Sequence, residues 1–208
     1  MEEKNLNAQE SLEIITRMIQ HTRRRLCLGS GNVCLLWGYT SVAVALLVWV
    51  VGFFSAHPGW NFLWFLIWIV GGTLSRHVER RSDDGARSYT DRISHGLWSI
   101  VGYCVLMGVA LCLGFMLFRG ANCWVLMLIF GLFVIGFAAS MQGVILAEKS
   151  LMLGGGVGML AGGVLLCCAL SGVPLLAAWI IPLFMFSFVC MMIVPGHILN
   201  HKARKSHV

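Results

Sequence analysis

Residues that could carry chemistry are scattered through this 208-residue sequence and form no known catalytic pattern. His197 and His201 lie four residues apart, so one face of a helix would present both imidazoles, but no third metal ligand accompanies them. The segment 76–95 adds two histidines and two neighbouring aspartates, whose spacing matches neither a zinc nor a calcium site. No H-E-x-x-H motif occurs either. The sequence therefore predicts no catalytic residue, no metal and no cofactor, and a protein that is not an enzyme.

Sulfur-containing side chains are abundant, with eight cysteines and 11 methionines. No C-x-x-C pair occurs, so neither a thioredoxin-like motif nor a zinc ribbon is present. Most of the cysteines lie in apolar segments, where a cysteine behaves as a small hydrophobe. Transport of a soft metal ion such as Cu(I) is the alternative, because cysteine and methionine bind it. Cys123 has two candidate disulfide partners, Cys167 and Cys168, and the sequence leaves open whether it pairs at all.

The elements that position these side chains are expected to be helices in a membrane, because the composition argues against a soluble fold. Hydrophobic residues make up 58% of the chain and charged residues 12%, whereas a soluble domain has about 25% charged residues. Six apolar stretches have roughly the 20-residue length that crosses about 30 Å of hydrocarbon. They are residues 32–54, 57–75, 96–118, 122–146, 151–171 and 174–194.

No Lys, Arg, Asp or Glu falls inside these six stretches. Burying one such side chain at the membrane centre costs roughly 2.5–3.5 kcal/mol, so their exclusion indicates that the stretches lie in lipid. Helices satisfy their own backbone hydrogen bonds there, and the stretches lack the alternation of barrel strands. The sequence therefore predicts an all-α, polytopic membrane protein with six transmembrane helices. Pro58 is expected to open the shortest of them, and Pro195 with Gly196 to end the last.

The basic residues indicate how the chain is oriented. Fourteen of the 15 Lys and Arg residues lie in residues 1–31, in the loop 76–95, at Lys149 or in the basic tail 195–208, and only Arg119 lies on the opposite side. By the positive-inside rule, both termini and the loop are cytoplasmic. The net charge of +6 therefore predicts attraction to anionic lipid headgroups rather than binding to nucleic acid.

Residues 1–31 precede the first span, and their pattern of apolar and charged residues predicts a cytoplasmic amphipathic helix. Acidic residues cluster early in this segment and basic residues late, as the helix dipole favours. If the helix lies in the headgroup region, Arg23, Arg24 and Arg25 contact lipid phosphates. A docking site for a cytoplasmic partner is the second interpretation of the same segment.

The stretch 151–171 contains glycine at every fourth position, namely Gly154, Gly158 and Gly162. Small residues at this spacing share one helix face and let two helix backbones approach closely. Three uses fit this face: packing within the bundle, a seam between two copies of the chain, or a groove for a solute. In the last stretch, Pro182 removes one backbone hydrogen bond and predicts a helix kink.

Several segments of the sequence together resemble a known family. They are the opening QESLEIITRMIQ, the GSGN and LLWGY around the first span, the WNFLW of the second, the loop sequence SYTDRI and the ending MMIVPGHILNHKAR. These segments are similar to a family of small six-span membrane proteins of anaerobic Gram-negative gut bacteria. The resemblance runs nearly end to end. It implies an inner-membrane location and genes that often neighbour winged-helix regulators, and it transfers neither an activity nor a site residue.

We therefore expect a non-enzymatic inner-membrane protein that acts by interaction, as a scaffold, sensor or regulatory partner. The expected partners are the lipid bilayer, a second copy of the chain, and a cytoplasmic or membrane protein. The alternative is a small transporter or channel subunit that passes a neutral or apolar solute between the helices around Gly154–Gly163 and the kink at Pro182. Proton coupling is disfavoured, because such relays use Asp, Glu or His within spans.

Overall fold

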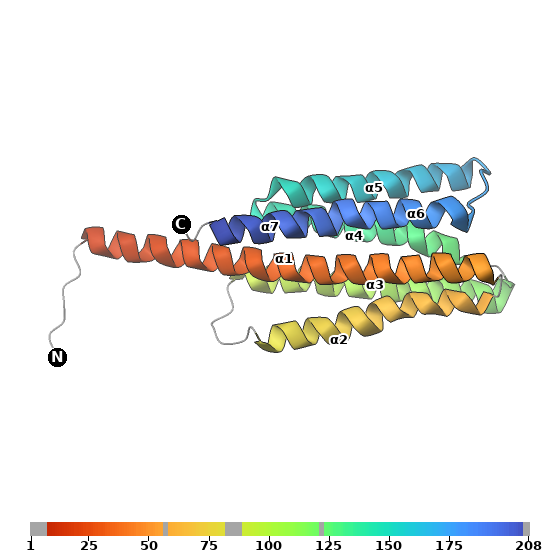
Figure 1. Ribbon diagram of the computed structural model, residues 1–208, viewed down its shortest axis with the longest axis horizontal. Coiled ribbons are helices and arrows are strands. Elements are labelled where there is room, and N and C mark those ends of the chain that lie inside the picture. Colours follow the sequence, from red (N-terminus) through yellow and green to blue (C-terminus); the bar gives the residue numbers. More distant parts are fainter. Residues whose placement is uncertain (1–7, 56–57, 82–88, 121–122, 206–208) are drawn as a thin grey trace.

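The computed structural model describes residues 8–55, 58–81, 89–120 and 123–205, and within these ranges it contains helices and no strand. Figure 1 shows the helices running side by side along one direction. Their order is α1 (Ala8–Phe54), η1 (Pro58–Phe65), α2 (Leu66–Arg81), α3 (Tyr89–Arg119), α4 (Trp124–Leu146), α5 (Lys149–Leu170), α6 (Ala177–Phe188), η2 (Val189–Ile193) and α7 (Val194–Lys205).

Five helices of the described chain are long and apolar enough to cross a membrane, in keeping with the predicted all-α, polytopic class. The second predicted span, 57–75, is divided between the 3-10 helix η1 and α2, and α2 alone has only 16 residues. A sixth crossing therefore stays a prediction. The five spans are Gly31–Phe54, Arg92–Arg119, Trp124–Leu146, Lys149–Leu170 and Ala177–Lys205.

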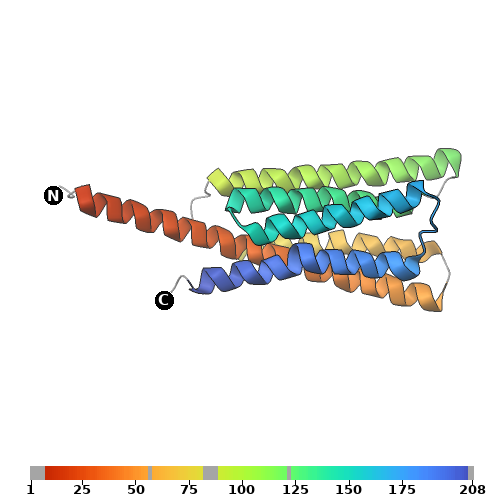
Figure 2. The ribbon, with the colours of Figure 1, turned by 90° about the horizontal axis from the view of Figure 1, so that it is seen from above.

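α1 is one uninterrupted helix of 47 residues, where the sequence suggested a separate helix before the first span. The segment 8–54 contains no proline, and Gly31 is buried against Gly196 and Asn200 of α7. This packing supports the backbone where the sequence Gly29-Ser30-Gly31 would otherwise weaken a helix. Residues 8–30, the projecting part of α1, consequently continue along the axis of the span, and the N-terminal portion of this segment extends beyond α7 and the rest of the bundle (Figures 1 and 2).

The last span also continues further than its sequence suggests. Pro195 and Gly196 were expected to end it, but α6, η2 and α7 follow one another without a break to Lys205. The reason lies in η2, a π turn in which the Val194 N–H donates to the Val189 carbonyl. A π turn shifts the hydrogen-bond register by one residue, and here it does so directly before a proline, which has no N–H to donate.

The helices form two groups, which Figure 2 shows from above. One group contains α1, α2 and the continuous α6–η2–α7 helix, and the other contains α3, α4 and α5. α4 and α5 pack most extensively on each other, and α5 also contacts α6, η2 and α7. α2 and α3 are peripheral, because α2 packs chiefly on α1 and α3 chiefly on α4.

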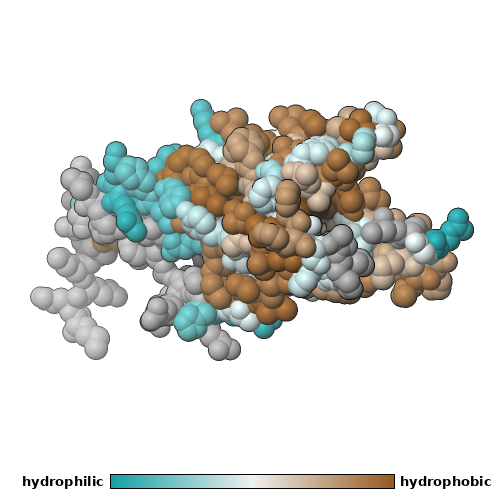
Figure 3. Space-filling model, turned by 45° about the vertical axis from the view of Figure 1, so that its right-hand side comes forward, coloured by the Kyte–Doolittle hydropathy of each residue, from teal (hydrophilic) through white to brown (hydrophobic). Residues whose placement is uncertain are grey.

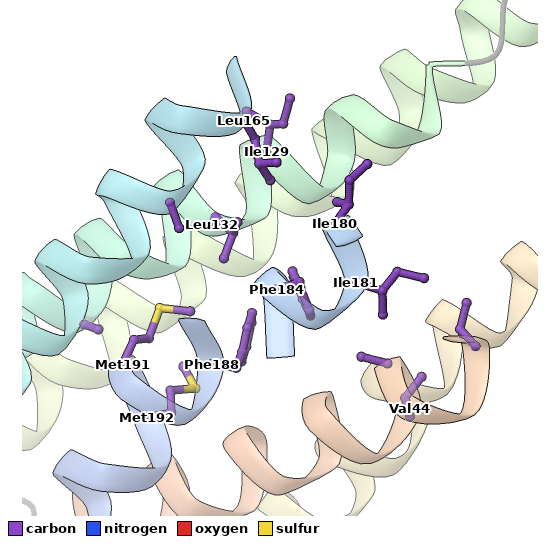
Figure 4. Packing of buried hydrophobic residues seen from close by; sticks show 14 residues of the cluster. Val44, Ile129, Leu132, Leu165, Ile180, Ile181, Phe184, Phe188, Met191 and Met192 are labelled. Carbon is purple, nitrogen blue, oxygen red and sulfur yellow. The ribbon is translucent and has the colours of Figure 1, made fainter. Parts of the chain in front are cut away.

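The main core lies between the two groups (Figure 4). Phe184 and Phe188 of α6 are buried there with ring centroids 4.5 Å apart. Met191 of η2 is fully buried beside Gly158 of α5. A smaller apolar cluster fills the end of the bundle where α7 finishes. It contains Cys34, Leu146, Leu151, Leu199 and Ala203.

The outer surface of the bundle is largely apolar, as Figure 3 shows for one face. Leu106 and Phe115 of α3, and Leu153 and Leu160 of α5, are more than half exposed. A soluble monomer rarely exposes continuous apolar patches above a few hundred Å². This surface is therefore suited to contact with hydrocarbon rather than water.

Candidate functional site

Polar side chains from three parts of the chain meet at the end of the bundle where α7 finishes. α1, the turn between α4 and α5, and α7 each contribute, and together they make the terminal polar cluster. It lies beside the smaller apolar cluster, so its members combine buried and water-facing atoms. The terminal polar cluster consists of Asn32, Tyr39, Glu148, His197, Asn200 and Lys202.

An ion pair between Glu148 and Lys202 joins the α4–α5 turn to α7. The turn forms because Ala147 takes the left-handed conformation (φ 54°) and ends α4, and the Glu148 N–H then donates to the Gly143 carbonyl at 2.8 Å. Glu148 is only 8% exposed. The Lys202 Nζ donates to the Glu148 Oε2 at 2.5 Å, and the lysine side chain is 57% exposed. A mostly buried carboxylate thus has its counterion on another helix, which favours the docking of α7.

Two side-chain pairs join α7 to α1 directly. The Asn200 Nδ2 donates to the Asn32 Oδ1 at 2.8 Å. The Tyr39 hydroxyl and the His197 Nε2 share a hydrogen bond of 2.8 Å. Both pairs depend on a close approach of the two helices, and small residues permit it.

The close approach of α1 to the last span is made at Gly38 and Gly196. A methyl group on Gly38 would lie 2.8 Å from Ile193 Cγ1, and one on Gly196 would lie 2.9 Å from Leu35 Cγ. Both distances are shorter than side-chain carbons normally allow. The glycines therefore set the spacing at which the Asn and Tyr–His pairs can form.

Chemically, the terminal polar cluster can hold three segments together and present a charged, water-accessible edge. Its hydrogen bonds and ion pair link helices, and its six members include no serine or cysteine nucleophile. Within the described ranges, no group of three or more His, Cys, Asp or Glu residues could hold a metal ion. The terminal polar cluster therefore links helices to one another.

A second polar contact lies between α3 and α4. Gln142 is 2% exposed, and its Oε1 accepts a hydrogen bond of 2.9 Å from the Ser94 hydroxyl. An amide buried among apolar helices gains from such a bond, because lipid offers no other partner. This contact ties the peripheral α3 to α4 near the same end of the bundle as Glu148.

The glycines of α5 are buried within the chain. A methyl group on Gly154 would lie 2.6 Å from the Cys190 carbonyl oxygen, and one on Gly158 would lie 2.8 Å from Met191 Sδ. Gly162 faces α4, where Phe133 Cδ2 would be 3.1 Å away. The chain's own α4 and η2 thus cover the face that a seam between two copies, or a solute groove, would need.

The remaining predicted site residues are placed as follows. Pro182 lies inside α6 and is partly buried. Arg23, Arg24 and Arg25 lie in the projecting part of α1, and their side chains are outside the described residues. The aspartate pair of the loop 76–95 also lies outside the described residues.

All seven cysteines that the structure describes are free thiols. The disulfide left open between Cys123 and Cys167 or Cys168 is therefore not formed. Cys123 instead contacts Cys112 of α3, whose Sγ lies 3.6 Å from the Cys123 carbonyl oxygen.

Sequence reasoning missed the terminal polar cluster, because its partners are far apart in the chain. Glu148 and Lys202 are 54 residues apart, and Tyr39 and His197 are 158 apart. Gln142 gave a readable signal, since it is the sole glutamine in the six apolar stretches. No family model matches the chain, and neither does any curated protein or solved structure.

Proposed function

We propose that this chain is a six-span protein of a bacterial inner membrane that acts by interaction and not by catalysis. Its projecting helix is the docking element, and its bundle is the anchor. The observation that carries the proposal is the continuity of α1, of whose 47 residues 24 belong to an apolar span and the other 23 continue beyond it. The resemblance to small membrane proteins of gut bacteria supports the same location.

A sixth crossing by η1 and α2 is supported by their combined length and contacts. Eight residues of 3-10 helix at about 2 Å each, followed by 16 residues of α-helix at about 1.5 Å, reach about 40 Å. Trp64 of η1 packs on Phe184 of α6 with ring centroids 5.4 Å apart. Phe65 packs on Trp124 at the start of α4, at 6.3 Å. An even number of crossings returns both termini to one side, as the charge pattern requires.

The projecting part of α1 is long enough to leave the headgroup region. Its 23 residues extend about 35 Å at 1.5 Å per residue, whereas the headgroups occupy roughly 5–8 Å on each side of the hydrocarbon. Arg23, Arg24 and Arg25 lie about 9–12 Å before Gly31 and are therefore nearest to lipid phosphates. Leu12 and Met18 lie further out and are about two-thirds exposed. These apolar side chains suit a cytoplasmic protein partner.

Photo-crosslinking in cells tests the docking role. A photoreactive residue is placed at Met18, and a control is placed at Phe137, which is exposed on the apolar surface of α4. We expect Met18 to crosslink to a cytoplasmic protein and Phe137 to crosslink to lipid. Crosslinks from both positions to lipid would contradict the docking role and favour a helix that lies along the membrane surface.

Reporter fusions test the orientation independently. A reporter that is active only in the cytoplasm, fused after Val208, is expected to be active. The same reporter fused after Arg119 is expected to be silent, because that turn lies at the other end of α3. Activity only after Arg119 would overturn the proposed orientation, whatever the crosslinks show.

The alternative function, a small transporter or channel subunit, is favoured by one feature of the last span. Pro182, the π turn Val189–Ile193 and Pro195 interrupt its regular backbone bonding, as happens in the helices of transporters. Proteoliposomes that contain the purified chain test it with neutral solutes. A saturable flux that empty liposomes lack would replace the docking role by transport.

A further inference from the structure

Two cysteines lie in contact at the end of the bundle opposite the terminal polar cluster. The Cys112 Sγ is 3.6 Å from the Cys123 carbonyl oxygen, although 11 residues separate them along the chain. α3 and α4 pack against each other, and Gly120 takes the left-handed conformation (φ 63°) where the chain leaves α3. Cys123 then directly precedes α4. The fold therefore places the Cys112 thiol of α3 against the backbone of Cys123, at the start of α4.

The two thiols differ in access. Cys112 faces inward from α3 and is 7% exposed, whereas Cys123 is partly exposed at the end of the bundle. Such a difference suits ordered thiol–disulfide exchange, in which an accessible thiol meets the oxidant and a buried thiol completes the reaction.

We propose that Cys112 and Cys123 are a dithiol pair that a disulfide oxidant converts to an intramolecular disulfide, which joins α3 to the start of α4. The proposal rests on the orientation given under the proposed function, because that orientation places this end of the bundle on the outer, oxidising side of the membrane. The link acts on α3, whose main packing partner in the described chain is α4.

The exchange proceeds in two steps. The Cys123 thiolate attacks one sulfur of the oxidant's disulfide, that bond breaks, and one oxidant thiol leaves as the mixed disulfide forms. The Cys112 thiolate then attacks the Cys123 Sγ, the mixed disulfide breaks, and the second oxidant thiol leaves. In total the two cysteines lose two electrons and two protons, and the oxidant gains both.

Oxidation of the purified full chain by oxidised glutathione tests the pair. Free thiols are then alkylated, the chain is digested, and the peptides are identified by mass spectrometry. We expect a peptide pair that joins Cys112 to Cys123, and six alkylated cysteines in place of the eight that the sequence contains. Eight alkylated cysteines, or a linked peptide that joins Cys123 to Cys167 or Cys168, would overturn the proposal.

Single variants test the order of the steps without depending on the stability of the link. With Cys112→Ser, the glutathione mixed disulfide at Cys123 is expected to accumulate, because no thiol resolves it. With Cys123→Ser, Cys112 is expected to stay reduced. Cys104→Ser, eight residues earlier on the same helix, is the matched control and is expected to keep the pair. Accumulation of the mixed disulfide on Cys112 in the Cys123→Ser variant would contradict the order.

Trapping thiols with acid in intact cells separates this proposal from the orientation. The linked peptide in extracts from cells supports both. A pair that oxidises after purification but is reduced in cells supports the dithiol pair and contradicts the outward placement. A pair that resists glutathione after purification contradicts the dithiol proposal, while the reporter fusions still decide the orientation.

Discussion

The α4–α5 seam and the α1–α7 seam hold the bundle together by different means. Along α4–α5 the backbones almost touch: a methyl group on Gly136 would lie 2.8 Å from the Gly155 carbonyl oxygen, and one on Gly143 would lie 2.6 Å from the Met152 nitrogen. One hydroxyl, of Ser140, crosses this seam to the Met152 carbonyl at 3.2 Å. Along α1–α7, glycines set the spacing, but side-chain pairs make the connections.

This difference matters because lipid does not drive helices together through the hydrophobic effect. A backbone seam is held by dense packing and tolerates no added atom. A polar seam at the edge of a membrane can exchange its hydrogen bonds for water, so it can open and close at a smaller cost. We therefore expect the α1–α7 seam, on the side that carries the projecting helix, to open more easily than the α4–α5 seam.

The largest expected effect comes from filling the backbone seam. Gly155→Leu places a side chain against the Gly136 carbonyl and the Ser140 nitrogen, which are backbone atoms that cannot move aside. We expect a loss of about 3 kcal/mol or more in the free energy of unfolding, measured in mixed micelles. Gly156→Leu is the matched control, since a methyl group there would meet nothing within 4 Å. Equal loss in both variants would show that glycine matters for helix flexibility and not for packing.

The next effect concerns the Glu148–Lys202 ion pair, which joins the α4–α5 turn to the α7 side of the polar seam. Lys202→Met leaves the buried Glu148 carboxylate without its counterion, and we expect a loss of about 1–2 kcal/mol in the free energy of unfolding. This value is below that of a fully buried pair because the Lys202 side chain is 57% exposed. Lys205→Met, an exposed lysine on the same helix, is expected to change little. Adding Glu148→Gln to Lys202→Met is expected to recover part of the loss, and no recovery would mean that the two residues do not interact.

The two seams were not equally predictable. The spacing of Gly154, Gly158 and Gly162 is local, so the sequence pointed to that face directly. The sequence left open which segments pack on this glycine face. Its partners, α4 and η2, are separate segments, and the positions of their own glycines and methionines do not repeat at the spacing of the α5 glycines. The choice among bundle packing, dimer seam and groove is a tertiary property.

The sequence did not show which residues pair in the polar seam. His197 stood out only as a possible metal ligand, and Asn32 and Asn200, which lie in the GSGN and MMIVPGHILNHKAR segments, are 168 residues apart. The continuity of helices was also hidden, because glycine and proline weaken a helix on average, while packing of Gly31 on α7 and the π turn before Pro195 offset that preference here. The class of protein, in contrast, followed from the exclusion of charge alone.

A smaller effect is expected at the contact between α3 and α4. A variant there tests whether one polar pair can hold two helices together as a glycine seam does. Gln142→Leu removes the bond from Ser94 and replaces the amide by an apolar side chain of similar size. We expect a loss of about 0.6–1.7 kcal/mol, the range of hydrogen bonds between membrane helices. Ser99→Ala is the control, since that hydroxyl donates to the His95 carbonyl of its own helix at 2.8 Å. A larger loss in the control would mean that the α3 helix itself, and not its link to α4, limits stability.

The smallest effect is expected at Tyr39 and His197. Tyr39→Phe removes one hydroxyl from a pair whose members are both exposed, so no buried group loses its partner and the expected loss is about 0.5 kcal/mol. Tyr103→Phe removes an exposed hydroxyl from α3 and serves as the control. If the α1–α7 seam opens more easily, Tyr39→Phe is also expected to raise the rate of amide hydrogen exchange at the end of α7 above that of the Tyr103→Phe variant. Exchange that stays at the level of the Tyr103→Phe variant would show that the α1–α7 seam is as rigid as the α4–α5 seam.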